Sequence, residues 1–418
     1  MKKKLPFLFF VLINLSATAF VAAEIWGFFG HRRINRMAVF TLPPEMITYY
    51  KPNIEYITAH AVDPDKRRYA TKHEAVRHYI DIDMYGEAPF PELPREWTEA
   101  LMVWTDLLLI NSAGDTTIIW EQKPQKRADG AGAEELWYPQ KSIFRDAVSP
   151  VLHQDYKSFF IENILSNYYE DEWICDCAGF ASFIGQNFRD CAKIIVEDHL
   201  SHKGIVPYHL MHMKRRLTKA FERNDARNIL RNSAEYGHYL ADAHVPLHTT
   251  ENYNGQLTDQ VGIHAFWESR IPELFADDTY DFFVGKAEYI DDPQTYFWDV
   301  VLESHSYLDS VLLIEKRLSQ TFPQDRQYCY DERLGRTIRT ECREYAAAYQ
   351  ASLNGLQEKR MQDAILAVGS VWYTCWVDAG SPDLRKLILT EKELAAEAEE
   401  EKELNERVNT GGIIGRPH

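Results

Sequence analysis

Two short strings constrain this chain more than any other feature. His238 and Asp242 lie four residues apart, as do His264 and Glu268 in the string His-Ala-Phe-Trp-Glu. Residues with this spacing project from the same face of an α-helix. Most residues between and around the first pair are apolar, which indicates a partly buried helix. Because unpaired charge is costly in such a place, the strings predict helices whose inner faces carry partnered or metal-bound imidazoles and carboxylates.

A third histidine strengthens the metal interpretation. His248 follows Pro246, which is expected to end the first helix and turn the chain. Imidazole nitrogens and carboxylate oxygens are ligands that suit zinc. A single His/Asp pair at this spacing is usually a surface hydrogen bond. Two pairs with an intervening histidine inside about thirty residues instead favour a site for more than one metal ion.

The apolar residues follow a helical period over most of the chain, which predicts an all-α fold. With 418 residues, 45% of them hydrophobic, the chain can bury a large core. We expect residues 24–381 to form the main domain, with 113–200 as an insertion, lid or packed subdomain. Helices are expected at 32–49, 94–110, 211–248 (split near 224–225) and 353–377, and a strand at 116–120. The stretch 382–418 reads as a charged tail, a solvated helix that fades into disorder.

Residues 1–23 resemble a secretory signal. Three lysines precede an apolar run from Leu5 to about Ala17, and Val21-Ala22-Ala23 offers small residues for cleavage. No later segment reaches 18 consecutive apolar residues, so no transmembrane anchor is expected. The predicted location is secreted or periplasmic.

Cysteine content and charge are compatible with an exported hydrolase. Six cysteines suit an oxidising compartment. Cys175 and Cys177 are too close to favour pairing with each other, and the pairing among the rest stays open. A net charge of −17 argues against a protein that tracks along nucleic acid through a basic groove. It does not exclude hydrolysis of phosphate esters, because bound cations can supply local positive charge.

Three earlier strings complete a pattern. Trp26-Gly-Phe-Phe-Gly-His31 follows the predicted signal, Asp63 lies in a basic segment, and Arg77-His78-Tyr-Ile-Asp81 comes next. In order and spacing, the five strings read W-x4-H, an Asp, H-x2-D, H-x3-D-x5-H and H-x3-E. They resemble the zinc-dependent phospholipase C / S1–P1 nuclease family over roughly 24–380.

The resemblance implies a helical domain of that family's type and a cluster of up to three zinc ions. Asp63, His78, His238 and Asp242 would bind one ion. His248, His264 and Glu268 would bind a second. Trp26 and His31 would bind a third, with Asp242 bridging two metals. Asp81 resembles the family's carboxylate that orients a ligand imidazole.

The chain departs from the family pattern in several places. The family's tryptophan is the mature N-terminus, whereas cleavage after Ala23 leaves two residues ahead of Trp26. Glu268 resembles the phospholipase branch, but the opening Trp-Gly-x-x-Gly-His resembles the nucleases. The family arginine three residues after the zinc-binding aspartate is replaced by Lys66.

The predicted activity is zinc-assisted hydrolysis of a phosphodiester. Asp63 and Asp242 are expected in the catalytic centre, with Lys66, Arg67 or Arg68 holding a phosphate oxygen; the alternative is that these cations are solvated loop charges. The favoured substrate is single-stranded nucleic acid, whose bases stack on aromatic side chains. A phospholipase C that releases phosphorylated head groups is the first alternative. A non-catalytic envelope protein that retains zinc is the second.

Overall fold

The computed structural model describes residues 28–123, 125–128, 135–138, 150–170, 172–185, 188, 190–333, 336–414 and 416. The predicted signal 1–23 and Trp26 lie outside these residues. The chain divides into two compact units, one of residues 1–84 with 205–418 and one of residues Tyr85–Gly204. We call them the helical unit and the inserted unit, and describe each by itself.

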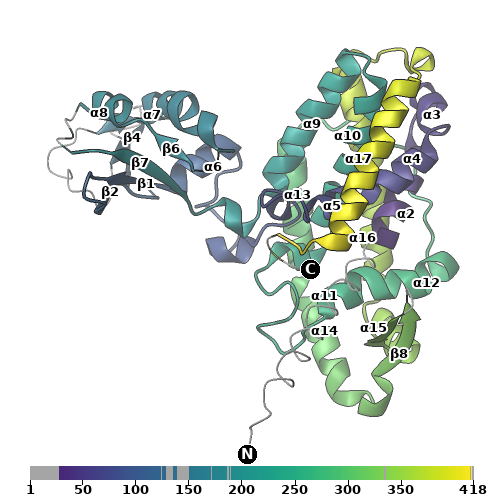
Figure 1. Cartoon of the computed structure of the whole chain (residues 1–418). Coiled ribbons are helices and arrows are strands. Elements are labelled where there is room, and N and C mark those ends of the chain that lie inside the picture. The colour runs from purple at the N-terminus through teal and green to yellow at the C-terminus, as the bar shows by residue number, and fades with distance from the viewer. Residues whose placement is uncertain are drawn as a thin grey trace, which may run out of the picture. The chain divides into compact units, whose positions relative to one another are not determined.

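The helical unit carries the larger share of the secondary structure (Figure 1). Short 3-10 turns join many of its helices, among them His60–Val62, Ala75–Arg77 and Pro246–Thr249. Its α-helices in chain order are α2 (Phe28–Ala38), α3 (Pro44–Tyr50), α4 (Ile54–Ala59), α5 (Asp63–Arg67), α9 (Val206–Glu222), α10 (Ala226–Ala243), α11 (Ile263–Ala265), α12 (Ile271–Thr279), α13 (Pro293–Ser306), α14 (Leu308–Thr321), α15 (Arg343–Ser352), α16 (Leu356–Asp378) and α17 (Glu391–Thr410).

Helix α10 forms the centre of this unit, in contact with α2, α9 and α16. Its first turn is capped by Asp225, whose side chain accepts a hydrogen bond from the backbone N–H of Asn228 at 3.0 Å. The expected break between α9 and α10 is confirmed at Asn224, which has a positive φ of 53°. All residues of α10 from Asn232 onward are buried, so the polar side chains of this stretch, including His238 and Asp242, face the protein interior.

A glycine sets how closely α2 approaches α10. A Cβ atom on Gly237 would overlap the amide group of Asn35 on α2. Asn35 is fully buried, and its Nδ2 donates to the carbonyl of Ala234 at 2.9 Å. The absent side chain at 237 therefore lets α2 lie directly against the segment of α10 that carries His238.

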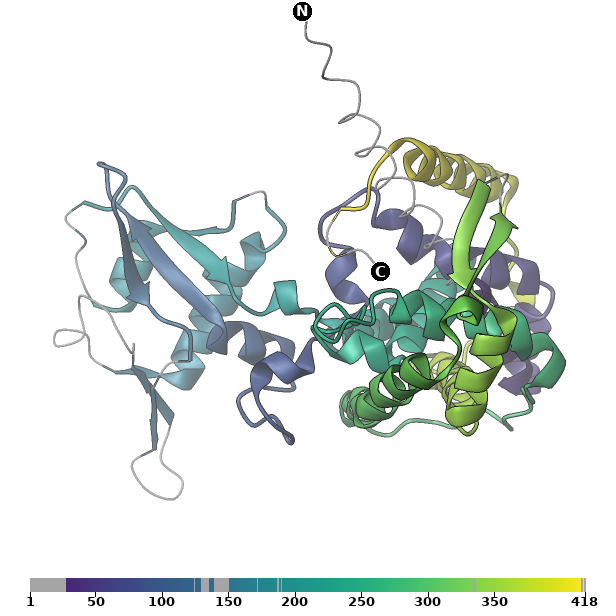
Figure 2. The ribbon, with the colours of Figure 1, turned by 90° about the horizontal axis from the view of Figure 1, so that it is seen from below.

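A hydrophobic cluster joins the turn after α10 to helices α11, α12, α14 and α15. It includes Phe266, Trp267, Tyr345 and Tyr349. A two-stranded hairpin of β8 (Tyr328–Arg333) and β9 (Arg336–Glu341) leads into α15, as Figure 2 shows. A disulfide between Cys329 and Cys342 closes it.

The inserted unit contains the other described strands. The chain is therefore mostly helical, but the predicted all-α fold is not complete, because β-sheets are also present. The elements of the inserted unit are α6 (Trp97–Val103), β1 (Thr105–Ile110), β2 (Thr116–Trp120), β3 (Gln125–Ala128), β4 (Glu135–Tyr138), β5 (Val151–Leu152), α7 (His153–Phe159), β6 (Ile174–Cys175), α8 (Cys177–Phe183) and β7 (Lys193–Asp198). One sheet has the order β2-β1-β7-β6 and a second has β3-β4-β5. A disulfide joins Cys177 to Cys191.

One predicted helix was wrong in its second half. The strand at 116–120 is confirmed, but the helix expected over 94–110 ends at Val103, and Thr105–Ile110 forms the central strand β1. The run Leu107-Leu108-Leu109-Ile110 fits either structure by its apolarity. Pairing with β2 on one side and β7 on the other decides it. The inserted unit begins at Tyr85, earlier than the 113 expected.

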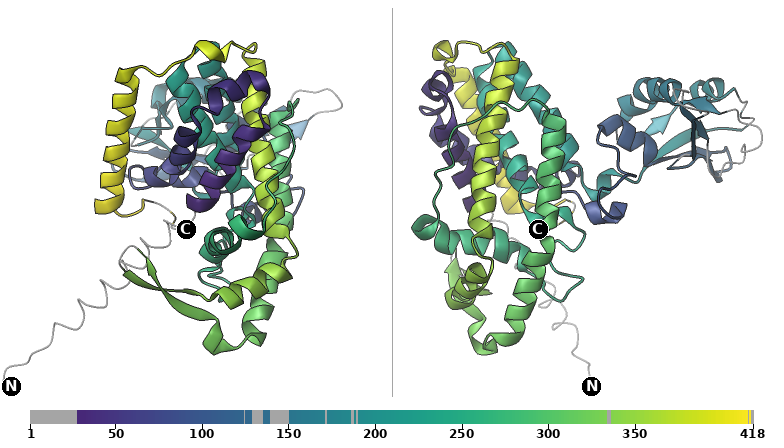
Figure 3. Two further views of the ribbon diagram at one scale, coloured as in Figure 1. Left: turned by 90° about the vertical axis from the view of Figure 1, so that its right-hand side faces the viewer. Right: turned by 180° about the vertical axis from the view of Figure 1, so that it is seen from behind.

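The C-terminal stretch contains a helix, as expected, but this helix contacts α5 of the helical unit rather than lying free in solvent. Helix α17 begins with a capping box between Thr390 and Glu393. Glu397 accepts a hydrogen bond from the Tyr56 hydroxyl at 2.8 Å, and Glu400 pairs with Arg231 at 2.6 Å. Figure 3 shows α17 along the outside of the helical unit. These partners lie far away in sequence, so the charge run alone did not reveal them.

Within the described residues, no helix combines the length and apolarity needed to cross a bilayer.

Candidate metal centre

The end of helix α10 and the turn after it position three of the predicted ligands. His238 and Asp242 lie on the buried face of α10, and Pro246 starts the 3-10 turn that carries His248. All three side chains are at most 2% exposed. The helical spacing and the proline turn in the sequence therefore place these groups as expected.

The first ligand group joins α10 to the chain after Arg77. His78 Nδ1 lies 2.9 Å from Asp242 Oδ2 and 3.0 Å from His238 Nε2. His238 Nε2 is 3.3 Å from the same Asp242 oxygen. Three side chains from two distant segments thus direct one donor atom each to a common point.

The second group uses the turn after α10 and the start of the next helix. His264 Nε2 lies 2.6 Å from Glu268 Oε2 and 3.0 Å from His248 Nε2. His248 Nε2 is 3.4 Å from the same glutamate oxygen. Glu268 lies on a π-helical turn, Phe266–Arg270, that continues α11.

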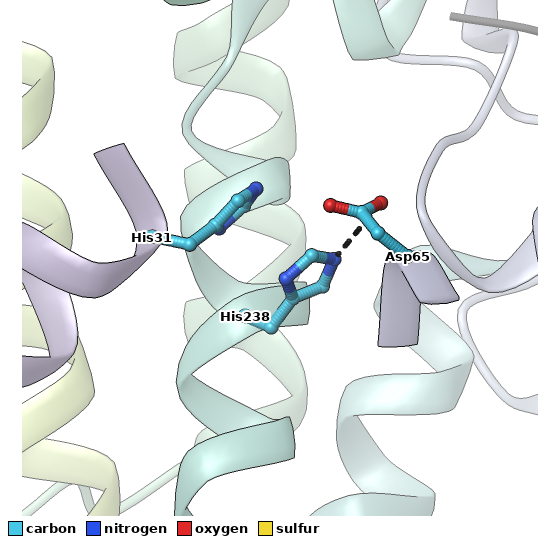
Figure 4. A group of neighbouring side chains, drawn as sticks. All are labelled: His31, Asp65 and His238. Atoms are coloured by element: carbon cyan, nitrogen blue, oxygen red, sulfur yellow. Dashed lines mark ion pairs between the residues drawn. The ribbon is translucent and has the colours of Figure 1, made fainter. Parts of the chain in front are cut away.

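His31 connects the two groups. From α2, its Nε2 lies 3.4 Å from Asp242 Oδ1 and 3.5 Å from Glu268 Oε1. Its ring stacks on that of His238 at a centroid distance of 3.9 Å. Asp65 Oδ1, from α5, lies 3.7 Å from His238 Nε2 (Figure 4). The same oxygen lies 3.8 Å from His78 Nδ1. The resulting metal-ligand cluster comprises His31, Asp65, His78, His238, Asp242, His248, His264 and Glu268.

Hydrogen bonds to the second ring nitrogens fix the imidazole orientations. His238 Nδ1 donates to the carbonyl of Ala61 at 2.8 Å, and His248 Nδ1 donates to the carbonyl of His78 at 2.7 Å. Each Nε2 is left to face the cluster as an acceptor. Glu74, which is fully buried, lies 3.8 Å from His78 Nε2 on the side away from Asp242. Carbonyl or carboxylate support of this kind is typical of metal-binding histidines.

The backbone reinforces the same arrangement. Ile80 N–H donates to the carbonyl of His248 at 2.9 Å, beside the His248–His78 bond that runs the other way. The segment after His78 and the turn carrying His248 are therefore held together by two reciprocal bonds.

The electrostatics of the cluster favour a bound cation. Burial acts to raise the pKa of Asp242, but the rings of His238 and His248 hold it well below its ordinary value. Burial likewise acts to raise the pKa of Glu268, and hydrogen bonds from His248 and His264 hold it well below. Both carboxylates are thus ionised although they are shielded from water, and a divalent ion would compensate their negative charge.

Asp63 takes a different position from the one expected. Its Oδ2 bonds to the ring of His60 at 2.6 Å, and its Oδ1 lies 3.1 Å from Lys66 Nζ. Two residues further along α5, Asp65 faces the cluster instead. Both aspartates stand in the string Asp-Pro-Asp, so spacing alone did not separate them.

Arg67 is held away from a phosphate-binding role. Its Nη1 donates to Glu235 at 2.8 Å, its Nε to Glu74 at 3.4 Å, and its Nη2 to the Tyr239 hydroxyl at 3.2 Å. Asp81, expected to orient an imidazole, instead accepts a hydrogen bond from Arg416. Trp26 lies outside the described residues.

Sequence reasoning missed Asp65 and Glu74. Glu74 lies four residues before His78, the same spacing that revealed the other pairs. In this pair the glutamate precedes the histidine, unlike in the other two pairs, and basic residues lie nearby. For these reasons the sequence did not indicate it as a ligand pair.

The donor set fits a metal. His31 Nδ1 is buried and has no hydrogen-bond partner among the described residues. A hollow of about 380 Å³, part of it open to solvent, lies beside His31 and Glu268 and is also lined by Trp267, Gln357 and Met361. Imidazole and carboxylate groups in this number suit zinc or a related divalent ion.

Neither a protein-family model nor a curated protein matches the chain.

Proposed function

We propose that this chain is a zinc-dependent hydrolase of phosphodiester bonds, with single-stranded nucleic acid as its substrate. The observation that carries the proposal is the convergence of eight histidine and carboxylate side chains, drawn from separate segments, on one buried cluster. A purely structural zinc site needs only four closed ligands. A donor set of more than four side chains is typical of catalytic clusters that hold more than one metal ion.

The residues divide into three ligand groups. His78, His238 and Asp242 would hold one ion, with Asp65 beside them. His248, His264 and Glu268 would hold a second.

The third group consists of His31 with Asp242 and Glu268, the carboxylates already used by the first two groups. Shared carboxylates of this kind keep the metal positions close together, as a multi-metal mechanism requires.

The chemistry divides between the ions and the chain. Bound zinc supplies a nucleophilic water at neutral pH and neutralises charge on a phosphate. The chain orients the ligands through Glu74, Ala61 and the backbone at His78. Lys66 pairs with Asp63 at 3.1 Å, which is one carboxylate against the two that engage Arg67, and it is our candidate for holding a phosphate oxygen. Arg67 is left out of this role because buried carboxylates already engage it.

We also propose that the protein is exported. The support is the signal-like composition of residues 1–23 and the disulfides Cys177–Cys191 and Cys329–Cys342, which persist in oxidising compartments.

The test pairs two neighbouring aspartates. Asp65→Asn should lower zinc affinity at least tenfold and reduce hydrolysis, because it removes a carboxylate that faces His78 and His238. The matched variant Asp63→Asn should keep the zinc content of the wild type. Zinc would be quantified by elemental analysis and by competition with a chelator. The reverse ranking would contradict the assignment.

The substrate test uses purified, zinc-loaded protein on single-stranded DNA, RNA and phosphatidylcholine. Cleavage of a nucleic acid supports the proposal. Head-group release from the lipid alone would replace it with phospholipase activity. Full zinc loading without turnover of any of them would overturn the hydrolase assignment, and a folded protein that binds no zinc would overturn the metal centre itself.

A further inference from the structure

The C-terminal segment places one arginine in a slot beside the metal-ligand cluster. The guanidinium of Arg416 lies 4.0 Å from the ring centroid of Tyr79 and 3.7 Å from that of Tyr253. Both distances are within the range of a strong cation–π contact. The arginine side chain is only 12% exposed, although it lies within three residues of the last position in the sequence.

Two acceptors complete the slot. Arg416 Nη1 donates to Asp81 Oδ1 at 2.5 Å, and Nη2 donates to the carbonyl oxygen of Thr250 at 2.8 Å. The Asp81 side chain is 10% exposed. Burial raises the pKa of Asp81, whereas the Arg416 guanidinium acts to lower it. A carboxylate in this position needs a cationic partner.

The shape of the slot selects the kind of cation. Two aromatic rings with two separate oxygen acceptors, one for each terminal nitrogen, match a flat group that carries donors on its edge. A guanidinium has this form, whereas an ammonium is a compact point charge without a face to stack. The four contacts therefore describe a guanidinium site rather than a general cation site.

The slot adjoins the metal-ligand cluster, because its residues are close to ligands in sequence or contact one directly. Tyr79 and Asp81 follow His78, and Thr250 is two residues after His248. The ring of Tyr253 meets that of His264 edge-on at 5.9 Å. A group entering or leaving the slot would thus contact residues one side chain away from the ligands.

The segment before Arg416 is attached by its backbone. Ile414 N–H donates to the carbonyl of Arg68 at 2.9 Å, and Arg68 donates in turn to the carbonyl of Arg416. Both bonds involve the backbone of the C-terminal segment, so changing the side chain at 416 leaves them available. The slot can therefore be emptied by a single substitution.

We propose that Tyr79, Asp81, Thr250 and Tyr253 form a guanidinium-binding site that the chain's own Arg416 fills, and that a guanidinium compound in solution binds there when this side chain is removed. Any effect of the site on hydrolysis rests on the proposed function. Binding itself does not.

The experiment measures binding of n-butylguanidinium by calorimetry to the full-length protein as purified. Arg416→Ala should bind the probe at least tenfold more tightly than the wild type. Arg407→Ala is the matched control, because Arg407 is an exposed arginine in the preceding helix. It should bind the probe as weakly as the wild type. Equal binding by Arg416→Ala and the wild type would overturn the proposal.

Two further variants test the geometry. Arg416→Lys keeps the charge without the planar fork, so it should leave the slot accessible to the probe; blockage equal to that by arginine would overturn the guanidinium assignment. In the Arg416→Ala background, Tyr253→Phe should retain probe binding and Tyr253→Leu should weaken it at least tenfold. Equal affinity of these two double variants would contradict a stacked site. Because no substrate is involved, a protein without hydrolase activity would still report on the slot.

Discussion

Replacing Gly237 by alanine tests how α2 is held against α10. In an exposed helix interior the change stabilises by about 1 kcal/mol, because glycine is the poorer helix former. At this position the new methyl group would overlap the buried amide of Asn35. The sign of the effect therefore depends on whether Asn35 can move.

The structure indicates that it cannot move cheaply. Asn35 is fully buried, and its Nδ2 donates to Ala234 O at 2.9 Å. Overpacking costs about 1–3 kcal/mol, and losing a buried hydrogen bond adds about 1 kcal/mol. After subtracting the helix-propensity gain of about 1 kcal/mol, Gly237→Ala should destabilise the protein by about 1–3 kcal/mol.

The assay is equilibrium unfolding in urea with a matched control. Gly30→Ala introduces the same methyl group on α2, where the nearest atom, Glu268 O, would be 3.9 Å away. It should be neutral or stabilising. In an Asn35→Ala background, Gly237→Ala should lose its penalty. Stabilisation by Gly237→Ala alone, or a penalty unchanged without Asn35, would refute the reasoning.

Three further perturbations probe the site and its surroundings. Glu74→Gln should weaken zinc binding by about 10- to 100-fold by chelator competition, because it removes the negative charge behind His78; an unchanged affinity would contradict this role. Burial lowers the pKa of His209 well below its ordinary value, so the unfolded state binds the extra proton as the pH falls below about 6.5. The stability that neutral His209 contributes is thus complete above that pH and decreases below it, by about 1 kcal/mol between pH 7 and 5.5. His209→Leu should remove this part of the pH dependence of the free energy of unfolding, measured by urea titration at several pH values. His202→Leu, at an exposed position, should keep it. Equal pH dependence in the two variants would reject the assignment. Chelation of the purified protein should lower its thermal midpoint, and added zinc should restore it; a midpoint insensitive to both would argue against metal binding by the native state.

The sequence was most informative where one local pattern determined both structure and chemistry. The four-residue spacing of His238 and Asp242 predicted a helix and a shared face, and the structure has both. His264 and Glu268 have the same spacing, but the helix changes from α11 to a π-helical turn between them. Their side chains are nevertheless in contact.

The sequence was least informative where long-range contacts choose between equal local options. Asp63 and Asp65 are separated only by Pro64, and the position of α5 against α10 decides which of them faces His238. The leucine run in β1 acquires its extended structure from β7, whose sequence lies more than eighty residues later. The composition after 381 predicts a tail that fades into disorder, and no local pattern in it indicates that Arg416 contacts Asp81, which is remote in sequence.

The reciprocal bonds between the segment after His78 and the turn at His248 have a consequence for assembly. One residue from each of the two principal donor triads takes part in this junction: His78 through its backbone carbonyl, and His248 through its ring and its backbone carbonyl. A substitution that loosens the junction would therefore displace a ligand of both triads, even if it replaced no ligand. Such a variant should lose zinc affinity at both triads rather than at one.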